Sequence, residues 1–339
     1  MNYPEKLKVG DTIGICAPSD GIVKPHKILK YEEAIKQLNA LGYKVIETES
    51  VRKSENGRSA PAKKRAQEFM ELLENEEVKL IIFANGGDFL PEMLEYLDFD
   101  KIKTLKPKWL QGYSDITGIS YLFNTILDIP TMYFQTIKDY AMKPLHKSLT
   151  DCLEIEKGNE IIQESFELYE KEWNPDELDP HATYNLTEKV EWKNVVGGEK
   201  IVMEGRSIGG CLDSIKSYIG TKYDKVENYI ERHKEDGNIW FLECFEANTA
   251  QLQITLWQMK NAGYFKNCNG IIFGRPLFIK EEYGISFNEA VKTALEDLNI
   301  PIICDADIGH VSPQMAIVNG AILKITSENG KGIVETKLI

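Results

Sequence analysis

Histidine, paired cysteines, long apolar runs and excess positive charge are all scarce in this 339-residue chain. No apolar run approaches the roughly twenty residues of a bilayer-spanning helix, so we expect no membrane segment. The six cysteines form no Cys-x-x-Cys pair, which predicts reduced, buried thiols and neither disulfides nor zinc. The net charge of -13 counts against a nucleic-acid partner, because phosphate binding needs clustered Lys and Arg. The N-terminus has no apolar signal core, so we expect a cytoplasmic protein.

The chain length predicts more than one domain, because single hydrophobic cores stop growing beyond roughly 250 residues. Residues 1–165 alternate strand-like and helix-like segments, which is typical of a parallel sheet with helices on both faces. Residues 166–198 are rich in Glu, Asp, Trp and Tyr, and we expect a linker or a lid there. Residues 199–339 look β-rich. The predicted fold is α/β: an N-terminal doubly wound, mostly parallel sheet domain followed by a β-rich α+β domain.

A serine stands between a strand and a helix in the run Gln-Gly-Tyr-Ser-Asp, residues 111–115. Ligands of open α/β sheets bind at the carboxyl ends of the strands, and a helix start stabilises negative charge. Ser114 is therefore a candidate nucleophile, and the backbone N–H of Asp115 is a candidate oxyanion donor. The alternative is a serine that caps the helix. The local pattern alone favours the cap, since Ile116 replaces the second glycine of a nucleophile elbow.

A nucleophilic serine needs a base, an orienting carboxylate and a second oxyanion donor. Gly86 and Gly87 follow a buried strand and could donate an N–H group, although a tight turn explains them equally well. Among only five histidines, His310 follows an apolar strand and precedes a loop, so it is the candidate base. Glu243 ends another apolar strand and would need a buried partner such as His310, with Glu246 as its competitor.

Two other chemistries fit the residues less well. Asp305 and Asp307 could bind a metal, but no His or Cys cluster accompanies them, so we expect no metal site. Glu243 and Glu246 could form a glycosidase pair, but their spacing in the sequence says little about their separation in space.

Several short motifs occur in the order that is found in one known family. On these motifs the sequence resembles the LD-carboxypeptidase family of serine peptidases, which includes muropeptide LD-carboxypeptidases and microcin C self-immunity peptidases. The resemblance extends over almost the whole chain. The matching stretches are residues 10–14, 17–19, 57–60, 65–66, 82–87, 112–117, 209–210, 220–221, 242–243, 274–276 and 309–310.

The resemblance implies which residues act and how the protein assembles. It implies a triad of Ser114, Glu243 and His310, the same three residues that the search from the residues favoured. It also implies that the oxyanion donors come from the Gly-Gly turn at residues 86–87 and from Asp115. The family uses no metal and no cofactor, and it typically forms homodimers.

The resemblance also implies a reaction, which is hydrolysis of an amide bond next to a free carboxylate. The substrate would be a small peptide, as in murein recycling, or a peptidyl nucleotide, as in microcin immunity. The long middle segment favours the microcin-like branch, and we expect substrate contacts from Asp88, Trp173 and Arg275. One departure concerns the substrate pocket: Phe134 and Gln135 replace a Gly-Pro pair. The alternative function is a protein that binds and sequesters a peptidyl ligand without cleaving it.

Overall fold

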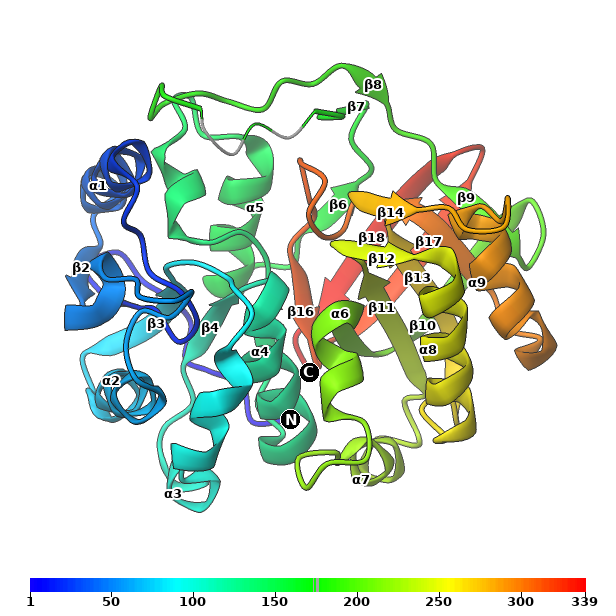
Figure 1. Cartoon of the computed structure of the whole chain (residues 1–339), viewed down its shortest axis with the longest axis horizontal. Coiled ribbons are helices and arrows are strands. Elements are labelled where there is room, and N and C mark those ends of the chain that lie inside the picture. The colour runs from blue at the N-terminus through cyan, green and yellow to red at the C-terminus, as the bar shows by residue number, and fades with distance from the viewer. Residues whose placement is uncertain (173, 175–176) are drawn as a thin grey trace.

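The computed structural model describes residues 1–172, 174 and 177–339 of the chain. Two sheets lie side by side, one formed largely by the first half of the chain and one by the second (Figure 1). This two-sheet α/β arrangement confirms the predicted fold class. The predicted domain limits at 165 and 198 stay a prediction.

The first sheet has six strands in the order β16-β5-β4-β3-β1-β2. Five of them run parallel, and β16, from the far end of the chain, pairs antiparallel with β5. Their bounds are β1 Thr12–Cys16, β2 Lys44–Glu47, β3 Val78–Phe83, β4 Trp109–Gly112, β5 Thr131–Tyr133 and β16 Ile317–Asn319.

Helices cover both faces of this sheet, as the alternating pattern predicts. Successive side chains of a strand point to opposite faces, so Leu80 and Ile82 pack into one apolar cluster while Ile81 and Phe83 pack into another. The first cluster includes residues of α1 (Pro25–Ala40), the 3-10 helix η4 (Ile137–Ala141) and α5 (Lys147–Glu156). The second includes residues of α2 (Ala62–Glu74), η2 (Leu90–Tyr96), α3 (Phe99–Thr104) and α4 (Thr117–Leu127).

The second sheet has eight strands in the order β6-β18-β17-β10-β11-β13-β15-β9. The four strands β10, β11, β13 and β15 are parallel, and the pairs that flank them are antiparallel. The last two strands, β17 and β18, form an antiparallel hairpin. The bounds are β6 Ile162–Glu164, β9 Lys193–Val196, β10 Lys200–Cys211, β11 Asn238–Glu243, β13 Cys268–Gly274, β15 Ile302–Ala306, β17 Ile322–Glu328 and β18 Lys331–Lys337.

Helices also pack on the second sheet, which has more helix beside it than a β-rich sequence pattern suggests. Trp240 and Leu242 of β11 face these helices, while Ile239 and Phe241 face the opposite cluster. The helices are α6 Leu212–Ile215, α7 Val226–Arg232, α8 Thr249–Asn261 and α9 Phe287–Leu295. The smaller elements are η1 Glu49–Arg52, η5 Lys216–Tyr218, η6 Glu296–Leu298, and the short strands β12 Glu246–Asn248 and β14 Phe278–Lys280.

The two sheets exchange strands, which ties the halves of the molecule together. β6 precedes the middle segment yet pairs with β18, while β16 comes from the end of the chain and completes the first sheet. Between them the middle segment passes across both halves and carries the short pair β7 (Leu168–Tyr169) and β8 (Glu188–Lys189) (Figure 1). The relative position of the halves is therefore fixed by shared backbone hydrogen bonds.

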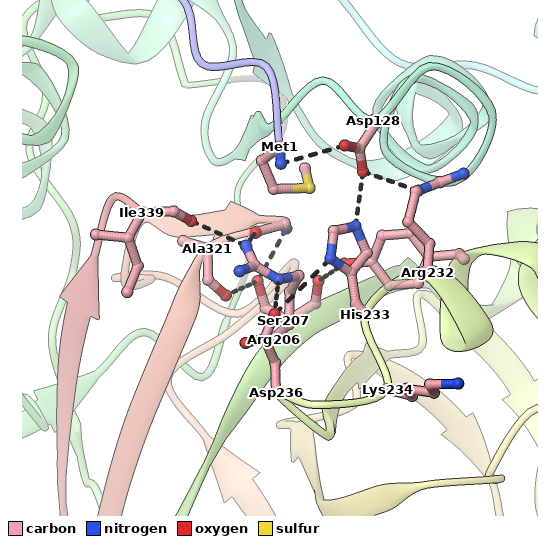
Figure 2. A network of polar contacts seen from close by, with 12 residues as sticks. Met1, Asp128, Arg206, Ser207, Arg232, His233, Lys234, Asp236, Ala321 and Ile339 are labelled. Atoms are coloured by element: carbon pink, nitrogen blue, oxygen red, sulfur yellow. Dashed lines mark hydrogen bonds and ion pairs between the residues drawn. The ribbon is translucent and has the colours of Figure 1, made fainter.

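A polar network joins the two halves near both chain ends (Figure 2). Asp128 follows α4 with a left-handed backbone (φ 60°), and its carboxylate contacts the amino group of Met1 at 3.2 Å and His233 Nε2 at 2.7 Å. Arg206 of β10 pairs with Asp236 at 2.6 Å and donates to the carbonyl of Ile339 at 3.0 Å. Residues from both halves of the molecule thus meet in one charge-paired cluster.

The cysteines and the helix lengths bear on disulfides and on membrane segments. All six cysteines are free; five of them are buried and Cys268 is partly exposed. Among the described residues, no helix is long and apolar enough to cross a membrane.

Candidate active site

The candidate residues all lie at or just beyond the carboxyl ends of parallel strands. Ser114 follows β4, Gly86 follows β3, Glu243 ends β11, and His310 lies four residues beyond β15. The carboxyl ends of parallel strands share one edge of a sheet, so each sheet brings its own members of this set together. Side chains from both sheets then meet in one place.

Ser114 lies at a sharp backbone turn. It is the first residue of the 3-10 helix η3 (Ser114–Ile116), and its φ of 65° is left-handed, which is uncommon for a residue with a side chain. Tyr113 takes the N-cap position and the turn has no side-chain cap hydrogen bond. The capping alternative is therefore wrong, and the strained turn presents the serine at the end of β4.

Glu243 and His310 form a hydrogen-bonded pair although 67 residues separate them. The Nδ1 of His310 donates to Oε2 of Glu243 at 2.8 Å, and the hydroxyl of Tyr133 donates to Oε1 at 2.6 Å. The Glu243 side chain is fully buried. Burial by itself raises the pKa of Glu243, but the charge of His310 and the hydrogen bonds from His310 and Tyr133 outweigh it, so the pKa lies below its usual range. Glu243 is therefore an ionised, fully hydrogen-bonded acceptor.

The ring of His310 also packs against two aromatic rings, both tilted relative to it. The centroid of Tyr113 lies 4.9 Å from it and that of Phe245 lies 4.6 Å from it. The neighbouring Gly309 has a left-handed φ of 96°, and a Cβ there would lie 2.6 Å from Oε2 of Glu243. Glycine is thus required for the carboxylate to reach the ring, and Nε2 is left as the nitrogen that can accept a proton.

The Gly-Gly turn after β3 packs directly against the serine. A Cβ on Gly86 would lie 3.1 Å from Oγ of Ser114 and 3.8 Å from the backbone nitrogen of Asp115. Gly87 has a φ of 153°, and a Cβ there would lie 2.4 Å from Oγ of Ser19. Only backbone can approach Ser114 this closely, which is the arrangement that an oxyanion hole needs.

The side chain of Asp115 links three loops, a role that the sequence did not indicate. Its carboxylate accepts from the hydroxyl of Ser19 at 2.5 Å and from the N–H of Leu90 at 3.0 Å. Burial raises its pKa despite these hydrogen bonds. The loops that follow β1, β3 and β4 are therefore held in one arrangement around Ser114.

Two adjoining cavities lie over these residues. The first, of about 360 Å³, is lined by Ser114 and His310 together with Gly86, Gly87 and Asp88. The second, of about 530 Å³, is lined by His310 and by residues of the middle segment, namely Glu170, Glu172, Asn174, Glu177 and residues 182–185. Described residues of the middle segment thus form a wall of this second cavity, and their role as a linker or a lid stays a prediction.

Of the expected substrate contacts Asp88, Trp173 and Arg275, only Asp88 lines the cavity at Ser114 in the described part of the chain. The contact of Asp88 with substrate stays a prediction. Trp173 lies outside the described residues. The guanidinium of Arg275 is buried, forms an ion pair with Asp307 and donates to the carbonyl of Asp305 at 2.7 Å. The structure thus gives Arg275 partners within the protein.

Asp307 explains why Arg275 is buried. Besides the ion pair, its carboxylate accepts from the indole N–H of Trp192 at 3.0 Å and from the N–H of Phe166 at 3.2 Å. Trp192 is only 2% exposed and packs in an apolar cluster with residues of the second sheet. The pair therefore anchors the middle segment beside the loop that carries His310. Across the described residues, no group of three or more His, Cys, Asp or Glu could hold a metal ion.

Comparison with known proteins assigns the family. The LD-carboxypeptidase N-terminal domain matches residues 13–134 and the C-terminal domain matches residues 204–325. A probable murein peptide carboxypeptidase of Bacillus subtilis is 25% identical over 99% of this chain and 95% of its own. The microcin C7 self-immunity protein MccF of Escherichia coli is 27% identical over 95% and 92%.

The fold agrees with the sequence comparison. The solved structure of MccF in complex with glutamyl sulfamoyl guanosine superposes with a TM-score of 0.80 at 23% identity, covering 100% of this chain and 99% of that one. The two family domains occur in order along the chain, and the fold matches that of a family member. The chain therefore belongs to the LD-carboxypeptidase family and is a peptidase.

Proposed function

We propose that this peptidase is a serine carboxypeptidase that acts through Ser114, His310 and Glu243. The observation that carries the proposal is the chain of hydrogen bonds from Tyr133 through buried Glu243 to His310, beside a serine at a strained strand-end turn. A carboxylate that fixes the histidine tautomer, and a serine in the same cavity, are the parts that acyl transfer needs.

The chemistry follows from these positions. Oγ of Ser114 attacks the carbonyl carbon while Nε2 of His310 takes the hydroxyl proton, and Glu243 stabilises the imidazolium. Backbone N–H groups of the turn at residues 86–87 and of Asp115 bind the oxyanion. His310 then gives its proton to the leaving amine, and water hydrolyses the acyl-enzyme by the same route in reverse.

The proposed substrate has an amide bond next to a free carboxylate. One relative is named a murein peptide carboxypeptidase and another a microcin self-immunity protein. The substrate is accordingly a small muropeptide or a peptidyl nucleotide, and the wall that the middle segment builds over the site favours the larger, microcin-like ligand. A cytoplasmic location, a role in murein recycling or microcin immunity, and a homodimeric assembly belong to the same proposal.

Labelling with a fluorophosphonate tests the nucleophile without knowledge of the substrate. The wild-type protein should label at Ser114, and Ser114→Ala should remove both the label and all turnover. Ser217→Ala is the matched control, because Ser217 lines a cavity beside Ser114 and has no role in the mechanism. Retained turnover in Ser114→Ala would overturn the assignment.

Mass spectrometry identifies the substrate class. The protein is incubated with a murein tetrapeptide and, separately, with aspartyl sulfamoyl adenosine. Loss of D-alanine marks the first class and release of aspartate marks the second. Tight binding of either compound with no label at Ser114 and no product would show a sequestering protein instead.

A further inference from the structure

Lys138 is a half-buried lysine beside the Gly-Gly turn that the mechanism above does not use. It lies on η4, beyond the carboxyl end of β5, and lines the same cavity as Ser114. Its Nζ donates to Oδ1 of Asn85 at 2.6 Å and to the carbonyl of Ala84 at 3.1 Å. These two acceptors immediately precede Gly86, so the ammonium lies next to the turn that packs on the nucleophile.

Among the described residues, the ammonium of Lys138 has only neutral hydrogen-bond acceptors. Within the part of the chain that the structure describes, no carboxylate lies within 4 Å of its Nζ. An ammonium has three hydrogens to donate, and two of them are accounted for by neutral oxygens. One donor and the whole positive charge are left toward the cavity. A buried charge without a partner is costly, and proteins retain one where a ligand supplies the partner.

The electrostatic surroundings agree with an open anion position. Burial lowers the pKa of Lys138 to about 8, so most of the ammonium is still charged at neutral pH. The other charges that act on it are those of Asp20, Lys27, Lys30 and Asp139, two of each sign. Asp20 and Asp139 favour the charged ammonium and Lys27 and Lys30 oppose it, and a carboxylate placed against the ammonium would form a charge-assisted hydrogen bond.

We propose that Lys138 binds the free carboxylate of the amino acid that leaves a muropeptide, the first of the two substrate classes proposed above. The inference rests on the proposed carboxypeptidase function. It adds the residue that restricts cleavage to the C-terminal end of a peptide, where a free carboxylate is present. The same Nζ holds Ala84 and Asn85, so binding of the carboxylate and placement of the oxyanion turn are coupled through one group.

Binding measurements on the Ser114→Ala background test this inference without turnover. The probes are a murein tetrapeptide and the same peptide with its terminal carboxylate converted to a carboxamide, compared by calorimetry. Lys138→Gln keeps a donor for the turn and removes the charge. It should weaken binding of the free acid on the order of 100-fold and leave the carboxamide within about threefold.

Two further variants separate charge from structure. Lys108 is another lysine whose pKa burial lowers to about 8. It directly precedes β4, and its Nζ donates to two backbone carbonyls at the amino-terminal end of β3, the opposite end of these strands from Ser114. Lys108→Gln should not change the ratio of the two affinities. Lys138→Arg keeps the charge and should retain most of the preference for the acid. Equal losses for both probes in Lys138→Gln would show a role in holding the turn alone.

The inference is overturned if the free acid binds no tighter than the carboxamide in the parent protein, or if neither binds. Failure of the proposed function is recognised separately. Fluorophosphonate labelling of Ser114 requires no substrate carboxylate, so a protein that labels normally but shows no carboxylate preference refutes the role of Lys138 only.

Discussion

Replacing Glu243 by Gln tests whether the triad needs a carboxylate beside His310. The carboxylate accepts two hydrogen bonds at once, from His310 on Oε2 at 2.8 Å and from Tyr133 on Oε1 at 2.6 Å. An amide of the same shape has only one accepting oxygen. The hydroxyl proton of Tyr133 favours that oxygen on its own side, which turns the amide NH₂ toward His310.

That orientation reverses the histidine tautomer. Nδ1 of His310 must then accept from the amide, so Nε2 carries the proton and can no longer take one from Ser114. We expect kcat to fall about 10³- to 10⁴-fold, which corresponds to about 4 to 5.5 kcal/mol of lost transition-state stabilisation. KM should change little, because Glu243 is fully buried and does not line the two cavities described above.

Tyr133→Phe should change kcat in opposite directions in the wild-type protein and in the Glu243→Gln variant. In the wild-type protein it removes a charge-assisted hydrogen bond worth about 1.5 to 3 kcal/mol and should lower kcat by roughly tenfold or more. In the Glu243→Gln background it frees the amide to rotate its oxygen toward His310, so kcat should rise. The assay is turnover of the substrate identified by mass spectrometry, with thermal unfolding as a check on folding. A Glu243→Gln enzyme within tenfold of wild type, or a further loss in the double variant, would refute the reasoning.

Two more predictions concern close packing and buried charge. Gly86→Ala places a Cβ 3.1 Å from Oγ of Ser114, so the labelling rate with fluorophosphonate and kcat should both fall about 10- to 100-fold while the fold is retained. Glu156, at the end of α5, is fully buried; among the described residues neither of its oxygens has a hydrogen-bond partner, and burial raises its pKa well above the usual range. The native state therefore keeps this proton while the unfolded chain loses it above about pH 4.5, so stability falls as pH rises, by about 1.4 kcal/mol per unit up to the native pKa. Glu156→Gln should raise the urea midpoint at pH 8 and leave it nearly unchanged at pH 4; parallel curves at both pH values would contradict this.

The sequence by itself indicated where strands end and which side chains stand at those ends. The apolar runs before Gly86, Ser114 and Glu243 predicted buried strands, because side-chain burial follows local periodicity. A polar or glycine residue that follows such a run lies at a strand end, where parallel sheets bind ligands. The motifs in order then indicated the family, and the family comparison confirms it.

Only the tertiary structure decided which of these residues touch. Tyr133 reaches Glu243 across 110 residues, and Asp115 reaches Ser19 across 96, because strand order places their loops side by side. The sequence analysis expected Arg275 to contact substrate, but the structure pairs its guanidinium with the buried carboxylate of Asp307. Nothing in the local sequence singles out Lys138, and only the fold places it in the cavity that Ser114 lines. Local pattern determines burial and strand ends, whereas partners across the sheet depend on register and strand exchange, which no local pattern encodes.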